Sequence, residues 1–299
     1  MVCRKCPGMR AGALQARADS LLRSIDNSLS GYNRGSLLSR INAGEELPLD
    51  DHFIANFELG RKIWELSEGA FDPSAAPIFD AWGFGFTKGE EPSGSDMDSL
   101  MQFTGMGHFT LEERPDGVYL VKDDPRCRLN FNAIAQGYSC DRLGALAEEY
   151  GCADYLAEVG REIRCKGERP GGGPWVIAIE SPSAETLPGE NPPHGTAVAD
   201  TLRLSDCGVV TSGNYRKYYE KGGRRYAHTI DPSTGRPVEH NLLSATVLAE
   251  NAATADAYAT WMMVIGTERA RTIAGTLGIT VWLIEDSGDM IEAGKAIPR

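Results

Sequence analysis

The sequence predicts an α+β fold, and three observations lead to this prediction. Short segments that alternate apolar and polar residues, such as Gly117 to Val121, lie between turns, which is typical of paired strands. Amphipathic runs such as Cys140 to Tyr150 carry apolar residues at helical spacing. No GxGxxG, GxxxxGK[ST] or HExxH motif is present, which disfavours a Rossmann oxidoreductase, a P-loop kinase and a zinc protease.

The expected elements follow the chain in order. In the first half they are an irregular start over residues 1–15, helices at Ala16 to Leu29 and Asp51 to Leu66, paired strands within Met97 to Val121, a strand at Arg128 to Asn132 and a helix at Cys140 to Tyr150. In the second half they are strands at Trp175 to Ile179, Thr196 to Leu204, Tyr226 to Ile230, Leu243 to Ala249 and Thr280 to Glu285, with surface loops at 88–95, 168–174 and 182–195.

Composition is typical of a globular enzyme. The chain has 299 residues, 41% of them hydrophobic and 24% charged, so it can bury a large core. We expect one domain over residues 1–299, built as two lobes. A formal net charge of −12 argues against a nucleic-acid-binding surface, and no stretch reaches the length of apolar residues that a membrane span needs.

A rigid turn is expected between His228 and Pro237. The Asp231 carboxylate can fold back onto its own backbone, Pro232 fixes φ, and Gly235 supplies a left-handed conformation. His228 should therefore be held in one place. A histidine there can act as a general base near neutral pH, and the alternative is a structural histidine that pins the turn.

Asp256 and Thr260 are four residues apart in a stretch of small residues. This spacing places a carboxylate and a hydroxyl on one face of a helix, and two hard oxygens so placed suit magnesium, which completes its shell with water and substrate phosphates. Taken alone, the two residues are better described as a capping aspartate and a back-bonded threonine in an alanine-rich core helix.

The segment from Arg128 to Tyr138 predicts a junction between a strand and a helix. Its residues Ala133, Ala135 and Gly137 are small, and such junctions expose N–H groups at the positive end of a helix, where a phosphate can approach closely. An ordinary connection between two elements is the alternative, because small residues are common there.

Seven blocks of the sequence, in this order, resemble those of the FAD:protein FMN transferases, the ApbE-type flavin transferases. They span nearly the whole chain and are Tyr32 with Ser36 to Asn42, Gly69 to Pro73 with Trp82 to Gly85, Asn132 to Tyr138, Glu158 to Gly160, Thr211 to Gly213, His228 to Pro237, and Ala255 to Ala257.

The resemblance implies a two-lobed fold of mostly antiparallel sheets flanked by helices. It also implies a magnesium-dependent enzyme that cleaves FAD, attaches FMN to a threonine of an acceptor flavoprotein and releases AMP. Asp256 and Thr260 would be metal ligands together with the carbonyl of Ala133, and Asp256 and His228 would be catalytic. The acceptor would be a subunit of a membrane redox complex or a flavin-dependent reductase.

The resemblance further implies a flavin-binding set. An aromatic ring can stack on a flavin or adenine, and a carboxylate can accept hydrogen bonds from ring or ribose groups. Two positions depart from the family pattern, because Gln136 replaces a residue that is more often charged and Asn130 replaces a common aspartate. The expected flavin-binding residues are Tyr32, Ala70, Phe71, Asp72, Asn130, Gln136 and Ile230, of which Phe71 is described equally well as a core residue.

Three functions remain open. The first is flavin transfer, the second is magnesium-dependent hydrolysis of FAD to FMN and AMP, and the third is FAD binding without catalysis. The family usually begins with an extended strand and is commonly exported, so the resemblance suggests the bacterial periplasm or the outer face of the inner membrane. Residues 1–16 show neither that strand nor an apolar signal core or lipobox, so we expect a truncated or misassigned start and do not exclude the cytoplasm.

Overall fold

The chain forms two compact units in the computed structural model, which describes residues 1–4, 11–84, 92–182, 198–214, 218–221, 224–227 and 229–295. Unit 1 contains Met1–Asp19, Gln136–Thr229 and Pro237–Arg299. Unit 2 contains Ser20–Ala135 and Ile230–Arg236. The helix α1 (Ala11–Leu29) therefore contributes residues to both units.

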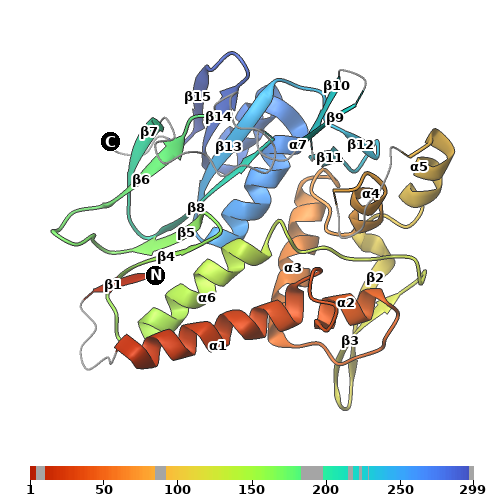
Figure 1. The fold of residues 1–299 in the computed structure, drawn as a ribbon, viewed down its shortest axis with the longest axis horizontal. Coiled ribbons are helices and arrows are strands. Elements are labelled where there is room, and N and C mark those ends of the chain that lie inside the picture. The colour runs from red at the N-terminus through yellow and green to blue at the C-terminus, as the bar shows by residue number, and fades with distance from the viewer. Residues whose placement is uncertain are drawn as a thin grey trace. The chain divides into compact units, whose positions relative to one another are not determined.

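Unit 1 is built on a seven-stranded sheet whose neighbouring strands are all antiparallel. The strand order is β1-β4-β5-β8-β13-β14-β15 (Figure 1). The bounds are Val2–Arg4 for β1, Asp154–Val159 for β4, Glu162–Lys166 for β5, Cys207–Gly213 for β8, Leu242–Ala249 for β13, Thr280–Glu285 for β14 and Met290–Gly294 for β15.

A hairpin covers one face of this sheet. Strands β6 (Trp175–Glu180) and β7 (Val198–Leu204) pair antiparallel and alternate buried with exposed residues. Their buried side chains join those of the sheet in one apolar cluster, and this burial is the main force that holds the hairpin in place. The cluster contains Trp175, Ile177, Ile179, Leu202 and Leu204 from the hairpin and Cys165, Cys207, Val209, Trp282 and Ile284 from the sheet.

Helices α6 (Ala135–Glu149) and α7 (Ala252–Leu277) complete unit 1, together with the first half of α1 and a hairpin of β9 (Tyr218–Lys221) and β10 (Arg224–Ala227). Helix α6 precedes β4, and α7 lies against β8 and β13. The Asn251 side chain caps α7 by accepting from the Thr254 N–H at 2.8 Å. Gly278 ends the helix in a left-handed conformation with a φ of 64°.

Unit 2 is mainly helical. Its elements are α2 (Leu37–Asn42), α3 (Asp51–Leu66), α4 (Ala76–Ala81), α5 (Gly94–Met101), the 3-10 turn η1 (Met106–His108), the hairpin β2 (Phe109–Arg114) with β3 (Gly117–Lys122), and the short strands β11 (Ile230–Asp231) and β12 (Arg236–Pro237). Edge-to-face contacts of Phe53 with Phe131 and of Phe57 with Phe109 anchor α3 in the core.

The predicted α+β class with mostly antiparallel sheets is confirmed. Helix α3 and strand β14 have the predicted bounds, and the strands predicted at 175–179 and 243–249 differ from β6 and β13 by one residue at an end. The predicted surface loop at 182–195 falls almost wholly outside the described residues, as does much of the loop at 88–95. No described helix has both the length and the apolarity to cross a membrane.

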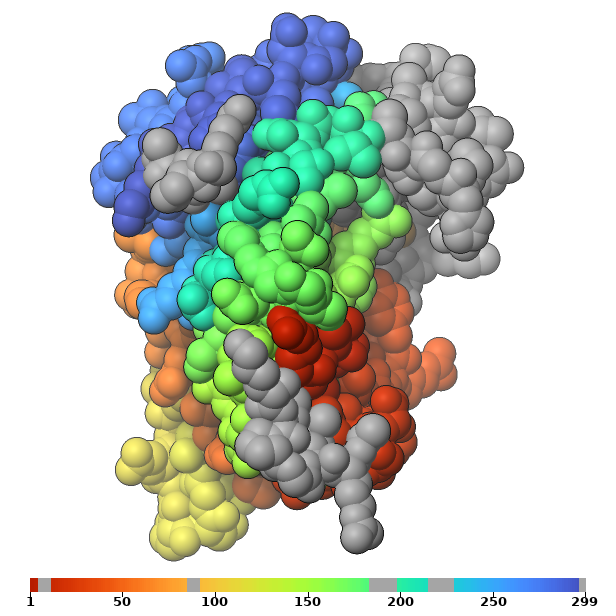
Figure 2. Space-filling view, turned by 90° about the vertical axis from the view of Figure 1, so that its left-hand side faces the viewer, coloured from red at the N-terminus to blue at the C-terminus, as the bar shows by residue number. Residues whose placement is uncertain are grey.

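Three predicted segments are wrong. The start is not irregular throughout, because Val2–Arg4 form β1, which pairs with β4, and α1 already begins at Ala11. Figure 2 shows β1 in red at the surface, beside the green strands of unit 1. Residues 128–132 form no strand, because their pairing stops at an isolated parallel bridge between Arg128 and Ala75, and the Asn42 side chain binds the backbone of Leu129. The strand predicted at 226–230 is divided between β10 and β11.

Candidate functional site

The first turns of α7 carry Asp256 and Thr260, as the sequence predicts. Asp256 is only 4% exposed, whereas Thr260 is half-buried. The Thr260 hydroxyl lies 3.5 Å from the Ser212 hydroxyl, which comes from the Thr211 to Gly213 block on β8. Unit 1 therefore brings oxygen atoms of α7 and β8 together.

The start of α6 lies against the start of α7. The Gly137 N–H donates to Asp256 Oδ2 at 3.1 Å. A Cβ atom at Gly137 would lie 2.3 Å from the carbonyl oxygen of Ala252, so only glycine permits this close approach of the two backbones. The small residues of the Asn132 to Tyr138 block thus position the carboxylate of Asp256.

Two further carboxylates surround Asp256. Burial, reinforced by the charges of Glu162 and Asp141, holds the pKa of Asp256 well above its usual range, although the Gly137 N–H opposes this shift. Burial also raises the pKa of Glu162 to about 7. Asp141 accepts from the N–H groups of Ala252 and Ala253, both at 2.9 Å, and so caps α7.

This arrangement fits a bound cation. Glu162 is 9% exposed, and its Oε2 atom is buried without a hydrogen-bond partner among the described residues. Like charges that are buried together are costly unless a positive charge offsets them. The carboxylate of Asp256 and the hydroxyl of Thr260 are hard oxygen ligands of the kind that magnesium prefers. The donor set therefore fits the magnesium ion that the sequence predicts.

Gln136 lies beside Glu162 in unit 1. A Cβ atom at Gly160 would lie 1.8 Å from Gln136 Nε2 and 2.7 Å from Glu162 Oε2, so both side chains extend over this glycine. Gly160 has a φ of 72°, which favours glycine as well. The Gln136 side chain is exposed and stays available to a ligand.

In unit 2, Tyr32 lies in the turn between α1 and α2. It is 65% exposed, so it is not a core residue, and its hydroxyl lies 3.5 Å from Nδ2 of Asn132. An exposed ring next to an amide is suited to stacking on an aromatic ligand. The structure is compatible with the predicted role of Tyr32 in flavin binding.

The Gly69 to Pro73 block follows α3 and has one buried and one polar member. Phe71 is 3% exposed, which supports its description as a core residue, while Ala70 is half-exposed. Asp72 Oδ1 accepts from the N–H of Ser74 at 2.7 Å and from its hydroxyl at 2.5 Å. Burial raises the pKa of Asp72 to about 6, although these bonds, a bond from Trp64 and the charge of His108 lower it.

Asn130 lies next to the Gly69 to Pro73 block, because its N–H donates to the carbonyl of Pro73 at 2.8 Å. The Asn42 amide donates to the carbonyl of Leu129 at 2.8 Å and accepts from its N–H at 2.9 Å, as a strand partner would. Ala133 lies in the turn that leads into α6 and is half-exposed. The segment that carries Asn130 and Ala133 is thus fixed from two sides.

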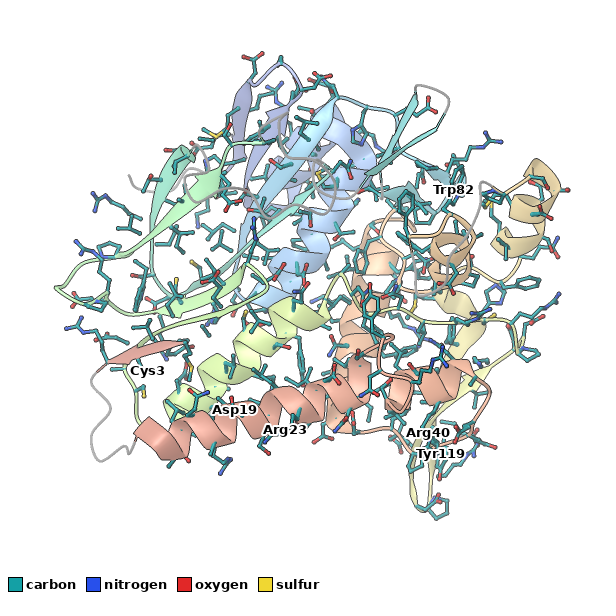
Figure 3. The ribbon with its side chains drawn as sticks, in the orientation of Figure 1. Cys3, Asp19, Arg23, Arg40, Trp82 and Tyr119 are labelled. Carbon is teal, nitrogen blue, oxygen red and sulfur yellow. The ribbon has the colours of Figure 1, made fainter. Side chains whose placement is uncertain are left out.

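The predicted turn after Ile230 is confirmed. Asp231 Oδ1 accepts from the Ser233 N–H at 2.9 Å, and Gly235 has a φ of 65°. Trp82, labelled in Figure 3, donates from Nε1 to the Gly235 carbonyl at 2.7 Å and holds the turn. Ile230 is buried, so its side chain belongs to the core. His228, the predicted base, lies outside the described residues.

The structure groups the predicted residues within each unit. In unit 1 it places Asp256, Thr260 and Gln136 on the neighbouring helices α6 and α7, and in unit 2 it places Asp72 next to Asn130. Sequence reasoning assigned no role to Glu162, Asp141 or Ser212. Glu162 follows the Glu158 to Gly160 block by two residues, and Ser212 lies inside the Thr211 to Gly213 block. A search of the motifs and their flanking residues could therefore have found both.

Comparisons with known proteins identify the family of this chain. The model of the ApbE family matches residues 2–283. The chain is 34% identical to the FAD:protein FMN transferase of Escherichia coli K12 over 285 residues, which cover 94% of this chain and 79% of the relative. It is also 34% identical to that of Vibrio cholerae over 281 residues, which cover 92% of this chain and 80% of the relative.

Solved structures show the same fold. The flavin transferase ApbE from Vibrio cholerae superposes with a TM-score of 0.82 at 31% identity, covering 97% of this chain and 91% of that chain. The apo form of the flavinyl transferase ApbE from Pseudomonas stutzeri superposes with a TM-score of 0.83 at 32% identity, covering 98% and 89%. The chain therefore belongs to the ApbE family.

Proposed function

We propose that the protein is a magnesium-dependent flavin transferase, which cleaves FAD and attaches FMN to a threonine of an acceptor flavoprotein. The relatives named as FAD:protein FMN transferases support the reaction class. The observation that carries the metal dependence is the buried Asp256 carboxylate next to Glu162, whose Oε2 is unpartnered among the described residues.

Asp256 and Thr260 would hold the ion. Magnesium, when bound, supplies positive charge that neutralises the oxygens of the FAD pyrophosphate. Gly137 fixes one oxygen of Asp256, which directs the carboxylate within unit 1. The carbonyl of Ala133 is still a predicted metal ligand. The predicted flavin contacts are Tyr32, Ala70, Asp72, Asn130 and Gln136. Phe71 and Ile230 are buried, so they would contact a flavin through their backbone.

The proposed reaction is a displacement at phosphorus. The threonine hydroxyl of the acceptor forms a P–O bond to the phosphorus of the FMN half, and the bond from that phosphorus to the bridging oxygen breaks. AMP leaves with the bridging oxygen, and the hydroxyl proton passes to a base, for which His228 is the predicted residue. We propose the bacterial periplasm or the outer face of the inner membrane for this reaction, as the resemblance suggests.

The third possible function is FAD binding without catalysis. That possibility depended on a missing first strand, whereas Val2–Arg4 pair with β4 along the edge of the sheet. A single experiment separates transfer from hydrolysis. The protein is incubated with FAD, magnesium and a candidate acceptor subunit, and AMP release is measured together with the intact mass of the acceptor.

Transfer predicts one AMP released for each FMN-sized mass gain on the acceptor. A matched acceptor with alanine in place of the target threonine should gain no mass. Release of AMP with no mass gain on any acceptor would establish the hydrolase instead, and the absence of both products would reject the catalytic proposal.

A further inference from the structure

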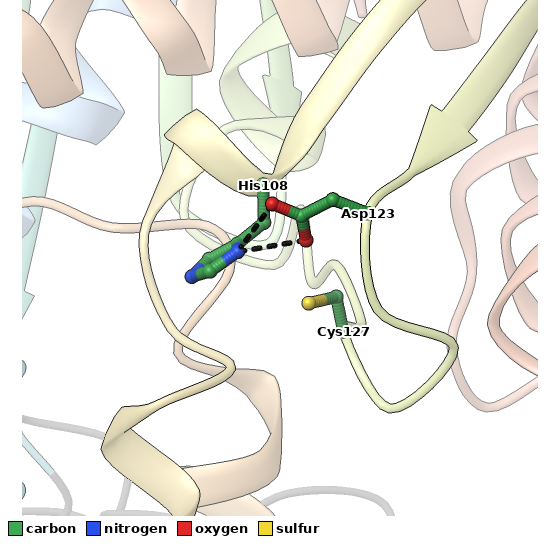
Figure 4. A group of neighbouring side chains, drawn as sticks. All are labelled: His108, Asp123 and Cys127. Carbon is green, nitrogen blue, oxygen red and sulfur yellow. Dashed lines mark hydrogen bonds and ion pairs between the residues drawn. The ribbon is translucent and has the colours of Figure 1, made fainter.

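We propose that His108, Asp123 and Cys127 form a zinc site in unit 2, separate from the proposed magnesium ligands. One ligand atom from each residue lies within 4.8 Å of the other two. Figure 4 shows the three side chains next to one another. The three residues come from the two ends of one hairpin and the loop that follows it, so local structure brings them together. The proposed flavin chemistry assigns no role to any of them.

The β2–β3 hairpin positions two of the ligands. Phe109 pairs with Lys122, and the Asp123 N–H donates to the His108 carbonyl at 3.1 Å, so His108 and Asp123 continue the ladder as the next cross-strand pair. Nδ1 of His108 lies 2.8 Å and 3.0 Å from the two carboxylate oxygens of Asp123. The backbone therefore fixes the ring and the carboxylate opposite each other.

The loop after β3 positions the third ligand. The Cys127 N–H donates to the Asp124 carbonyl at 3.1 Å, which closes a turn. Lys122 Nζ donates to the carbonyl of Cys127 at 3.2 Å and to that of Ile41 at 3.1 Å. The Cys127 side chain is fully buried and free of a disulfide. Its sulfur is thus held in place by the protein itself.

The neighbouring Asp124 does not compete for this position. Its carboxylate accepts from Arg126 at 2.6 Å through Nη2 and at 2.9 Å through Nε. Arg126 also stacks over the ring of Phe103, with its Cζ atom 3.7 Å from the ring centroid. Asp123 is therefore the carboxylate of this loop that remains directed at His108 and Cys127.

The ligand types indicate which metal would bind. A thiolate, an imidazole nitrogen and a carboxylate oxygen suit zinc, whereas magnesium and calcium prefer oxygen ligands alone. Ligand atoms around tetrahedral zinc are about 3.3 to 3.8 Å apart, given its bond lengths of about 2.0 to 2.3 Å. Shifts of about 1 Å in the half-buried His108 and exposed Asp123 side chains would give this geometry, with water in the fourth position.

A catalytic triad of the same residues does not fit. In a triad, the carboxylate binds one nitrogen of the imidazole and the other nitrogen takes the proton of the nucleophile. Asp123 binds Nδ1, and Figure 4 shows the other ring nitrogen pointing away from the sulfur of Cys127. The convergence of all three ligand atoms on one side of the ring favours a metal site instead.

Cobalt binding tests this proposal, because Co²⁺ substitutes for zinc and a thiolate ligand gives it a charge-transfer absorption band. Metal-free full-length protein should bind one equivalent of Co²⁺ with this band, and zinc should displace the cobalt. Cys127→Ser should abolish the band, and His108→Gln and Asp123→Asn should each weaken zinc binding about 10-fold or more. Flavin transfer is not the readout, so the result is independent of the proposed function.

Two control variants make the test specific. Cys3→Ser removes another free, partly buried cysteine, and Asp256→Asn removes the proposed magnesium ligand, so both should keep the cobalt band. Circular dichroism checks that Cys127→Ser folds. If it does not fold, zinc binding by the His108→Gln and Asp123→Asn variants, which change more exposed side chains, tests the site. A wild-type protein without the band, or a band that survives all three substitutions, would overturn the zinc site and leave a surface ion pair.

Discussion

Among single residues, Asp256 combines a proposed role in metal binding with a cost in stability. Burial raises the pKa of its carboxylate, and the charges of Glu162 and Asp141 reinforce this shift. Asp256→Asn keeps an acceptor for the Gly137 N–H but removes the charge. We expect AMP release to fall about 100-fold or more, while the metal-free protein becomes about 1 to 2 kcal/mol more stable to unfolding.

Initial-rate assays with FAD and urea unfolding without metal measure the two effects. Asp98→Asn on α5 is the control, because Asp98 is exposed and should change neither quantity. An Asp256→Asn variant that is destabilised but fully active would show that this carboxylate is structural.

Asp72 makes stability depend on pH. Its pKa is raised from 3.8 to about 6, so the folded state binds a proton more tightly than the unfolded state does. Protonation of Asp72 therefore stabilises the folded state fully at pH values below the unfolded pKa. This contribution to the free energy of unfolding, about 2 to 3 kcal/mol, is lost as the pH rises through about 6. Asp72→Asn cannot titrate, so its stability relative to the wild type should rise between pH 4.5 and 7.

Urea unfolding of both proteins at several pH values in this range measures that difference. Asn at position 72 can still accept the bonds from Ser74, so the comparison isolates the charge. A difference in the free energy of unfolding that stays constant with pH would mean that Asp72 titrates normally in the folded protein.

The positions of some of these residues could be predicted from the sequence, and those of others could not. Asp256 and Thr260 could be placed on one helical face because a spacing of four fixes it, and the turn at Asp231 to Gly235 could be predicted from its Asp, Pro and Gly residues. Glu162 could not be placed beside Asp256, since that proximity depends on how β5 packs against α7. The burial of Phe71 and Ile230 depends on tertiary packing in the same way.

At the scale of elements, the contact between α6 and α7 determines where Asp256 lies. A Cβ at Gly137 would lie 2.3 Å from the Ala252 carbonyl oxygen, so Gly137→Ala must separate the two helices. We expect a loss of about 2 to 3 kcal/mol in the free energy of unfolding, together with a lower affinity for magnesium. Chemical denaturation and metal titration measure these changes.

Gly275→Ala on α7 is the matched control. A Cβ at Gly275 meets no atom within 4 Å, so alanine there should stabilise the helix by about 0.5 to 1 kcal/mol. Equal effects of the two substitutions would mean that the close approach of α6 and α7 is not tight in solution.

Elements with clear periodicity were predictable, and those defined by distant partners were not. Helix α3 and strand β14 were predicted to the residue, because apolar spacing and flanking turn residues mark their ends. Residues 128–132 alternate like a strand, yet they form an isolated bridge between Arg128 and Ala75, and the Asn42 side chain binds the backbone of Leu129. Strand β1 has three residues, which are too few for its sequence to show alternation. It is a strand because it pairs with β4.

At the scale of the whole molecule, magnesium should act as a stabilising ligand of the folded state. A ligand that binds only the folded protein raises its stability by about 2.7 kcal/mol at 100 times its Kd. The wild-type melting temperature should therefore increase with magnesium concentration, and that of Asp256→Asn should not. Calorimetry over a magnesium series checks this, and an equal increase in both proteins would place the ion elsewhere.

In the proposed function, this ApbE-family chain transfers FMN with the help of an ion held by Asp256 and Thr260. The most direct measurement is the intact mass of an acceptor flavoprotein after incubation with FAD and magnesium, compared between the wild type and Asp256→Asn. We predict an FMN-sized mass gain at the acceptor threonine with the wild type alone. An acceptor that gains no mass although the wild type releases AMP from FAD would contradict this prediction. Equal modification of the acceptor by the wild type and by Asp256→Asn would contradict it as well.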